Sequence, residues 1–370
     1  MRNPNRSAVR PALWLGATVI TLGLVATGCG DDKKDTATTD PTTTVAGSTF
    51  DYASLSATIN GSGSSFQDTL QQTVKGEFAK VATGATVNYA KSGSSAGKTD
   101  LQTKTVQFAG TDSLIKDEDK EKFAGGEVLY FPIAAAPITV SYNAPGVDGL
   151  KLTADVIAGI FQGEITTWTD PKIAADNAGV TLPDKPIVVV HRSDGSGTTS
   201  NFTKFLKAAA PTVWKLDSGD TVNWPANTQG AEKNSGVAKI VKDTVGAIGY
   251  VDLSDAVSAG LQRASVKNVD GKFVEAKLPG ASAALAGTTV KDDLTFNPIN
   301  AAGAESYPIT APTWMIVYAK QEDAKVAETL KGYLNFMLTT GEDLANGVGY
   351  AKLPTELNAR AIAQISKITS

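Results

Sequence analysis

The chain has 370 residues, and its 34 Lys and Arg against 38 Asp and Glu give a formal net charge of −4 at pH 7. This excess of acid excludes the broad basic field that nucleic-acid binding needs, so any bound anion must be held by local dipoles and a few donors. A single Cys and a single His exclude an internal disulfide and a His/Cys zinc site, and we expect no metal ion and no cofactor.

The N-terminal segment predicts export. Three arginines precede an apolar stretch at residues 12–26 that is too short for an ordinary membrane span. Residues 24–29, Leu-Val-Ala-Thr-Gly-Cys, resemble the lipobox of bacterial lipoproteins, although Ala26 stands where Leu, Val or Ile is preferred. We therefore expect residues 1–28 to be a lipoprotein signal peptide and Cys29 to be the lipidation site.

The remaining chain predicts a tether followed by two lobes. Residues 29–50 are rich in Asp, Thr and Lys with little apolar content, which is typical of a flexible tether. The roughly 340 residues that follow the signal peptide exceed the size of one comfortable core, so two lobes are expected.

From residue 51 onward, short β-branched runs alternate with helical patterns. An apolar side chain recurs every four residues at Phe66, Leu70, Val74 and Phe78, which predicts one face of a helix over residues 66–82. Further helices are expected to start near Ser94 and Asn201. Strands are expected at residues 57–60, 86–90, 106–111, 127–132, 138–142, 187–190, 247–251 and 314–318. Residues 268–300 are expected to be irregular. This alternation indicates an α/β fold with mainly parallel sheets.

Three Ser/Gly-rich turns lie where a strand is expected to lead into a helix: residues 61–66, 92–97 and 190–198. Each places hydroxyls and free backbone N–H groups at a helix N-terminus, where the helix dipole favours an anion. In the last turn Arg192 adds a planar fork of donors, and Ser196 and Thr198 add hydroxyls. The turn predicts a site for a tetrahedral anion. Asp194 would repel that anion unless it orients Arg192, accepts a proton from the ligand or points away.

Asp112 follows another expected strand, at residues 106–111, and its role can be interpreted in two ways. It can accept a hydrogen bond from a protonated oxyanion, which would favour phosphate, since phosphate carries a proton at neutral pH and sulfate does not. It can equally be the N-cap of a helix that begins at Ser113. The segment alone leaves both interpretations open.

Motifs along nearly the whole chain resemble one known family. They lie at residues 61–66, 88–95, 108–112, 192–198, 246–251 and 307–310, and Arg-x-Asp-Gly-Ser-Gly-Thr at 192–198 is the most specific. The chain is similar to the phosphate-binding receptors, or substrate-binding lipoproteins, of high-affinity phosphate ABC importers. The resemblance implies a two-lobed periplasmic-binding-protein fold of type II with two hinge crossings. Lobe I would comprise residues 51–134 plus 308–370, and lobe II residues 135–307.

By matched position, the resemblance also implies the site and the partners. The phosphate-binding residues would be Ser65, Phe66, Ser94, Asp112, Arg192, Ser196, Gly197 and Thr198, with Asp194 pairing with Arg192. Ser65 stands where many relatives have Thr, and Gln67 stands where Pro is common, so we expect the start of that helix to differ slightly from the family. The protein would be a non-enzymatic monomer, lipid-anchored to the outer face of the cell membrane, that delivers inorganic phosphate to ABC importer permease subunits.

Two alternatives remain at this point. The site could take another tetrahedral oxyanion. The protein could also be an exported serine hydrolase or phosphatase, because residues 93–97 form a Gly-x-Ser-x-Gly pattern. Such an enzyme needs a His beside Ser95, yet the sole His191 adjoins Arg192. Residues 92–99 are also one residue from a Walker A loop, but an exported protein meets little ATP.

Overall fold

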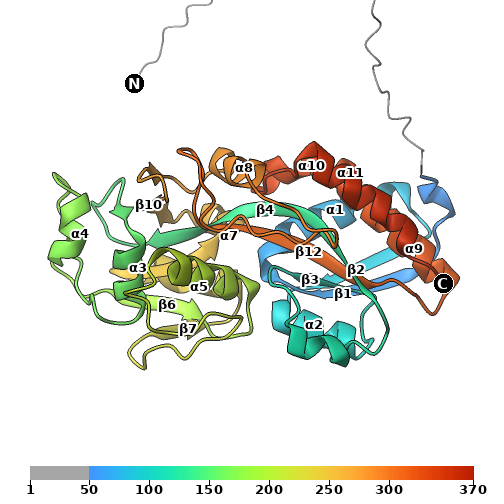
Figure 1. Cartoon of the computed structure of the whole chain (residues 1–370), viewed down its shortest axis with the longest axis horizontal. Helices are drawn as coiled ribbons and strands as arrows, with labels where there is room; N and C mark the ends of the chain where they lie inside the picture. Colours follow the sequence, from blue (N-terminus) through green and yellow to red (C-terminus); the bar gives the residue numbers. More distant parts are fainter. Residues whose placement is uncertain (1–49) are drawn as a thin grey trace, which may run out of the picture. The chain divides into compact units, whose positions relative to one another are not determined.

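The computed structural model of the protein describes residues 50–370 (Figure 1). The expected signal peptide, Cys29 and the tether up to residue 49 lie outside the described residues. Within residues 50–370 no helix is both long enough and apolar enough to cross a membrane.

Strands and helices alternate along the described chain. The strands are β1 (Thr58–Gly63), β2 (Thr86–Ala90), β3 (Phe108–Thr111), β4 (Val128–Tyr142), β5 (Lys151–Leu152), β6 (Val188–Arg192), β7 (Gln229–Ala231), β8 (Ala247–Asp252), β9 (Gln262–Arg263), β10 (Ser265–Lys267), β11 (Phe273–Val274) and β12 (Thr310–Tyr318). The α-helices are α1 (Asp68–Val81), α2 (Ser94–Gln102), α3 (Ala154–Phe161), α4 (Pro171–Asp176), α5 (Gly197–Ala209), α6 (Lys233–Asp243), α7 (Leu253–Ala259), α8 (Leu278–Ala286), α9 (Ala324–Leu338), α10 (Thr340–Ala345) and α11 (Thr355–Gln364). Short 3₁₀ turns are η1 (Tyr52–Ser54), η2 (Ser65–Gln67), η3 (Asp117–Lys122), η4 (Asn346–Val348) and η5 (Ile365–Lys367).

The main sheet has the strand order β2-β1-β3-β12-β4-β8-β6-β7, with β9 paired to β4. On one flank β1 pairs in parallel with β2 and β3, and on the other β6 pairs in parallel with β7 and β8. We call these flanks, with the helices that follow their strands, the β1 half and the β6 half. The long strands β4 and β12 run antiparallel to each other between them (Figure 1). The expected α/β class is confirmed, and each half carries parallel strands.

The two central strands continue from one half into the other. β4 pairs with β12 over Val128–Pro137 and then with β8 over Ile138–Tyr142. The two places where the chain passes between the expected lobes, at residues 134–135 and 307–308, lie in or next to these paired strands, and close by the backbone N–H of Ile138 donates to the carbonyl of Ile309 at 2.8 Å. The prediction of two separate strands at 127–132 and 138–142 is wrong because the extended chain persists through Pro132 and Pro137. The register with β12 shifts once, next to Pro132, between Thr313 and Trp314.

Most of the other expected elements are present. The strand at residues 86–90 is β2, and the periodic stripe Phe66, Leu70, Val74 and Phe78 is buried against the core. Complete burial of such side chains contributes about 1.5–3 kcal/mol each. The helix itself begins only at Asp68, after the 3₁₀ turn η2, so its start does differ at Gln67.

Two helix predictions need correction. Helix α5 begins at Gly197 and not near Asn201, because Ser196 caps it by accepting a hydrogen bond from the backbone N–H of Thr199 at 3.2 Å. The expected anion turn is thus partly the first turn of a helix. The region 268–300, expected to be irregular, contains α8, whose Pro279 lies in the first turn, where a Pro is tolerated.

Candidate functional site

The candidate site lies where strands from both halves end. Parallel strands β1, β2 and β3 have their carboxyl ends at one edge of the β1 half, and β6 and β7 have theirs at one edge of the β6 half. Each of these five strands is followed by residues of the site. This arrangement is the one in which open α/β sheets bind ligands.

The turn after β1 supplies hydroxyls and a helix start. Ser64 is the N-cap of η2, and its Oγ accepts a hydrogen bond from the backbone N–H of Phe66 at 3.0 Å. The same Oγ donates to Asp112 Oδ2 at 2.5 Å. Ser65 and Phe66, which the sequence singled out, are both buried here, whereas Ser64 was not named as a site residue. Its position inside the Gly-Ser-Gly-Ser-Ser-Phe motif was the available signal.

Asp112 follows β3 and is 1% exposed. Its Oδ2 accepts from Ser64 Oγ and, at 3.4 Å, from Ser94 Oγ, while its Oδ1 accepts from Thr313 Oγ1 at 2.6 Å. Burial raises the pKa of Asp112 to about 6, although the hydrogen bonds from Ser64 and Thr313 and the charge of Arg192 oppose the rise. No helix begins at Ser113, and the next helical turn is η3 at Asp117, so the N-cap interpretation is wrong.

A chain of buried side chains orients Thr313 toward Asp112. Tyr333 donates to Gln71 Oε1 at 2.7 Å, Gln71 Nε2 donates to Gln67 Oε1 at 2.7 Å, and Gln67 Nε2 donates to Thr313 Oγ1 at 2.7 Å. A hydroxyl that receives an amide N–H directs its own hydrogen elsewhere, here to Asp112. Asp112 Oδ1 is therefore held as an acceptor. Gln67, which departs from the Pro common in the resembled family, is a link in this chain.

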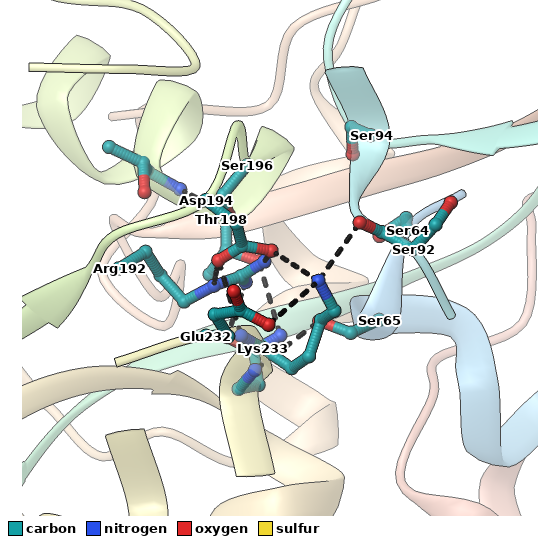
Figure 2. A network of polar contacts seen from close by, with 12 residues as sticks. Ser64, Ser65, Ser92, Ser94, Arg192, Asp194, Ser196, Thr198, Glu232 and Lys233 are labelled. Atoms are coloured by element: carbon teal, nitrogen blue, oxygen red, sulfur yellow. Dashed lines mark hydrogen bonds and ion pairs between the residues drawn. The ribbon is translucent and has the colours of Figure 1, made fainter. Parts of the chain in front are cut away.

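The turn after β6 carries Arg192 and Asp194 in a two-pronged ion pair (Figure 2). Arg192 Nε and Nη2 donate to the two carboxylate oxygens of Asp194, both at 2.6 Å. Although burial raises the pKa of Asp194, the hydrogen bonds and charge of Arg192 and the hydrogen bonds of Lys233 outweigh this effect and lower the pKa to about 2. The predicted contact between Asp194 and Arg192 is thus present, with both carboxylate oxygens of Asp194 facing the guanidinium.

Helix α5 starts directly against Asp112 of the other half. A Cβ on Gly197 would lie 2.7 Å from Ser94 Oγ and 2.8 Å from Asp112 Oδ2, so only Gly permits this approach. Ser196, Gly197 and Thr198 are all buried at this helix start. The structure therefore brings together every residue that the sequence named for anion binding.

The structure also adds two residues that sequence reasoning missed, Lys233 and Asn234 at the start of α6. Lys233 Nζ donates to Asp194 Oδ2 at 3.1 Å and, across the halves, to the carbonyl of Ser92 at 2.9 Å (Figure 2). Its φ of 63° is a left-handed conformation that non-Gly residues rarely adopt, and such strain is often found at functional sites. The signal in the sequence was a further strand-to-helix turn, Glu-Lys-Asn-Ser-Gly at residues 232–236.

The two halves are in direct contact around this site. Asn201 Nδ2 donates to the carbonyl of Asp112 at 2.6 Å, and the N–H of Ser95 donates to the carbonyl of Gly195 at 3.2 Å. Lys98 Nζ lies 2.8 Å from Asp220 Oδ2. The structure thus has the turns of both halves closed on each other.

The resulting set of groups has one chemical character. Arg192, the hydroxyls and the helix N-termini of α2, α5 and α6 are donors or carry partial positive charge, and Asp112 is an acceptor placed among them. Such a site can hold a compact tetrahedral oxyanion that carries one proton. Among residues 50–370 no group of three or more His, Cys, Asp or Glu side chains could hold a metal ion.

The hydrolase alternative gains no support from the geometry. His191 stacks on Trp224 with ring centroids 5.0 Å apart, and its Nδ1 lies 2.9 Å from the carbonyl of Arg192. Ser95 Oγ donates instead to Asp220 Oδ2 at 2.9 Å. Within the described chain no hydrogen bond joins Ser95 to His191, which a serine nucleophile with a His base requires.

The family model and the curated relatives that match this sequence indicate the same family. Residues 36–340 match the PBP superfamily domain. The chain is 34% identical over 323 residues to the phosphate-binding protein PstS of Pasteurella multocida, covering 86% of this chain and 92% of that one. It is 32% identical over 355 residues to the phosphate-binding protein PstS 3 of Mycobacterium tuberculosis, covering 93% of this chain and 95% of that one.

Solved structures share the fold. A high-affinity periplasmic phosphate-binding protein bound with phosphate at pH 8.5 superposes with a TM-score of 0.69 at 24% identity, over 83% of this chain and 93% of that one. A putative phosphate ABC transporter substrate-binding protein with bound phosphate from Clostridium perfringens gives a TM-score of 0.60 at 21% identity, over 80% and 100% of the two chains. The two-lobed periplasmic-binding-protein fold is thereby confirmed.

Proposed function

Because the chain belongs to the PBP superfamily and, within it, to the family of the PstS phosphate-binding proteins, we propose that it is an extracytoplasmic receptor that binds inorganic phosphate and delivers it to an ABC importer permease. The family is one of binding proteins and not of enzymes. Capture would exchange the hydration shell of phosphate for a closed set of directed donors.

The observation that carries the proposal is the position of Asp112 among hydroxyl donors at the contact between the two halves. Ser64 and Ser94 lie against its Oδ2, and the start of α5, from the other half, comes close to the same oxygen at Gly197. A fully deprotonated tetrahedral anion would have no proton to donate to this carboxylate and would meet like charge there, whereas phosphate can donate its proton to it.

The proposed ligand set is the one expected from the sequence, drawn from both halves. It comprises Ser65, Phe66, Ser94, Asp112, Arg192, Ser196, Gly197 and Thr198, with Asp194 holding Arg192. In the same proposal, lobe I comprises residues 51–134 plus 308–370 and lobe II residues 135–307, so that β4 and β12 carry the crossings. Closure around phosphate would signal the loaded state to the permease.

We further propose that the protein is a monomer anchored through lipid on Cys29. The support is the basic and apolar leader and the lipobox resemblance at residues 24–29. Membrane fractionation of cells that produce the full chain, or its Cys29→Ser variant, checks the anchor. The parent should be found in the membrane fraction and the variant should be released from it.

Isothermal titration with phosphate tests the function itself. Phosphate should bind with one site per chain, and His191→Ala should leave that binding intact, since the imidazole stacks on Trp224 and does not face Ser95. Titration with sulfate tests the selectivity for phosphate, and incubation with a chromogenic phosphomonoester tests for hydrolase activity. Absence of heat with phosphate, preference for sulfate, or turnover of the ester that His191→Ala abolishes would contradict the proposal.

A further inference from the structure

Asn234 contacts the proposed site with both polar atoms of its side chain and with its backbone N–H. The residue is fully buried. Its side-chain oxygen accepts from Arg192 Nη1 at 3.2 Å, and its side-chain nitrogen donates to Thr198 Oγ1 at 3.2 Å. Its backbone N–H donates to Ser65 Oγ at 3.3 Å, which joins the β6 half to the β1 half. One residue thus touches three of the proposed ligands.

The chemistry of these partners fixes the direction of each hydrogen bond. A guanidinium can only donate, so the amide oxygen of Asn234 must face Arg192 and the amide nitrogen must face Thr198. The backbone N–H also can only donate, so Ser65 Oγ is an acceptor from it. In the described part of the chain neither hydroxyl has another hydrogen-bond partner. Each therefore retains its own hydrogen for a ligand.

Arg192 is constrained in the same way. Three of its five N–H groups are used, two by Asp194 and one by Asn234. The other two, one on each terminal nitrogen, remain to meet two oxygens of an anion. Removal of the Asn234 oxygen would free the third and loosen the guanidinium.

We propose that Asn234 is the positioning residue that sets the polarity of the site, by making Ser65 and Thr198 donors and by fixing which N–H groups of Arg192 face the ligand. This inference rests on the proposed phosphate function. A hydroxyl can either donate or accept a hydrogen bond, and the contacts with Asn234 leave the hydroxyls of Ser65 and Thr198 as donors to the ligand. Asp112 is then the acceptor for the ligand's proton.

Two near-isosteric variants separate polarity from packing. Asn234→Asp keeps the acceptor for Arg192 but draws the hydroxyl hydrogen of Thr198 away from the ligand and adds a negative charge, so phosphate affinity should fall by about 100-fold or more. Asn234→Leu removes both side-chain hydrogen bonds without adding an acceptor, so affinity should fall by about 10-fold. A packing role alone predicts the reverse order, because Asp retains the shape of Asn.

Asn177→Asp is the matched control. Asn177 is 4% exposed and hydrogen-bonds to Lys151 and Ile173 away from the site. Its change to Asp should leave phosphate affinity within about 3-fold of the parent, even where it lowers the unfolding temperature.

A double-mutant cycle gives the readout that a purely structural role would not move. In a Thr198→Val background the penalty of Asn234→Leu should shrink from about 10-fold to about 3-fold, because the hydroxyl that Asn234 directs is already gone and only the contact with Arg192 is lost. If Asn234→Asp does not fold, this cycle, which uses only Asn234→Leu and Thr198→Val, tests the inference by itself. An undiminished penalty, or a Leu variant as weak as the Asp variant, would overturn the inference. If the parent itself binds no phosphate, the proposed function fails; if the parent binds and both Asn234 variants match it, only this inference fails.

Discussion

Two aspartates in one site have opposite electrostatic surroundings. Asp112, from the β1 half, is met by the hydroxyls of Ser64, Ser94 and Thr313, and its pKa is raised to about 6 by burial. Asp194, from the β6 half, is met by Arg192 and Lys233, and its pKa is lowered to about 2. Neutral donors orient a carboxylate without neutralising it, whereas cations do both. The comparison assigns ligand discrimination to Asp112 and the orientation of Arg192 to Asp194.

The largest expected effect comes from removing the cation of the Asp194 pair. Arg192→Met should weaken phosphate binding by about 1,000-fold, because it deletes two free N–H donors and leaves Asp194 less compensated beside the anion. Arg360→Met is the matched control, since Arg360 is half-buried away from the site and donates to the carbonyl of Lys291. Titration calorimetry of both variants checks the prediction, and comparable losses in both would refute the role of Arg192.

The same substitution at the two aspartates should change stability in opposite directions at pH 8. Asp194→Asn should lower the free energy of unfolding by about 1–3 kcal/mol, because Arg192 and Lys233 lose a charged partner. Asp112→Asn should raise it by a similar amount, since a buried charge without a contacting cation disappears. Urea unfolding of the two variants and the parent measures both changes. Changes of the same sign in the free energy of unfolding of the two variants would contradict the opposite surroundings of the two aspartates.

Removal of one neutral donor to Asp112 should have a smaller effect on phosphate affinity. Thr313→Val takes away the hydroxyl that Gln67 directs onto Asp112, so the carboxylate should take up a proton more readily and phosphate affinity at pH 7 should fall by about 10-fold. Thr139→Val, at another buried Thr that donates to a carbonyl, is the control. Equal affinities for the parent and Thr313→Val would show that the chain of side chains behind Asp112 has no effect on the ligand.

The smallest effects should appear in the pH dependence of stability without ligand. Because the folded-state pKa of Asp112 is raised, the native state holds its proton longer than the unfolded chain, and this residue's contribution falls as the pH rises from about 4 to about 6. The pKa of Asp194 is lowered, so its contribution is present above about pH 4 and is lost as the pH falls toward about 2. The difference in urea midpoint between the parent and each Asn variant should change with pH only in the corresponding range.

The sequence predicted the strand ends and Ser/Gly turns because their signals are local. Gly and Ser mark the turns, and the spacing from Phe66 to Phe78 marks one helix face. It did not predict Asn234 or Thr313 as site residues, because each acts through a partner far away in the chain: Asn234 meets Ser65, and Thr313 meets Asp112. It also divided β4 in two, since a Pro usually interrupts a strand and the long pairing with β12 is not encoded locally.

The ratio of phosphate to sulfate affinity at pH 8, measured by titration calorimetry for the parent and for Asp112→Asn, tests the central claim most directly. An acceptor that requires the ligand's proton predicts that the parent prefers phosphate by at least about 100-fold. In Asp112→Asn the amide can donate to a deprotonated oxygen, so the preference should shrink to within about 10-fold. Equal affinity for the two anions in the parent, or a ratio that the substitution leaves unchanged, would contradict the account.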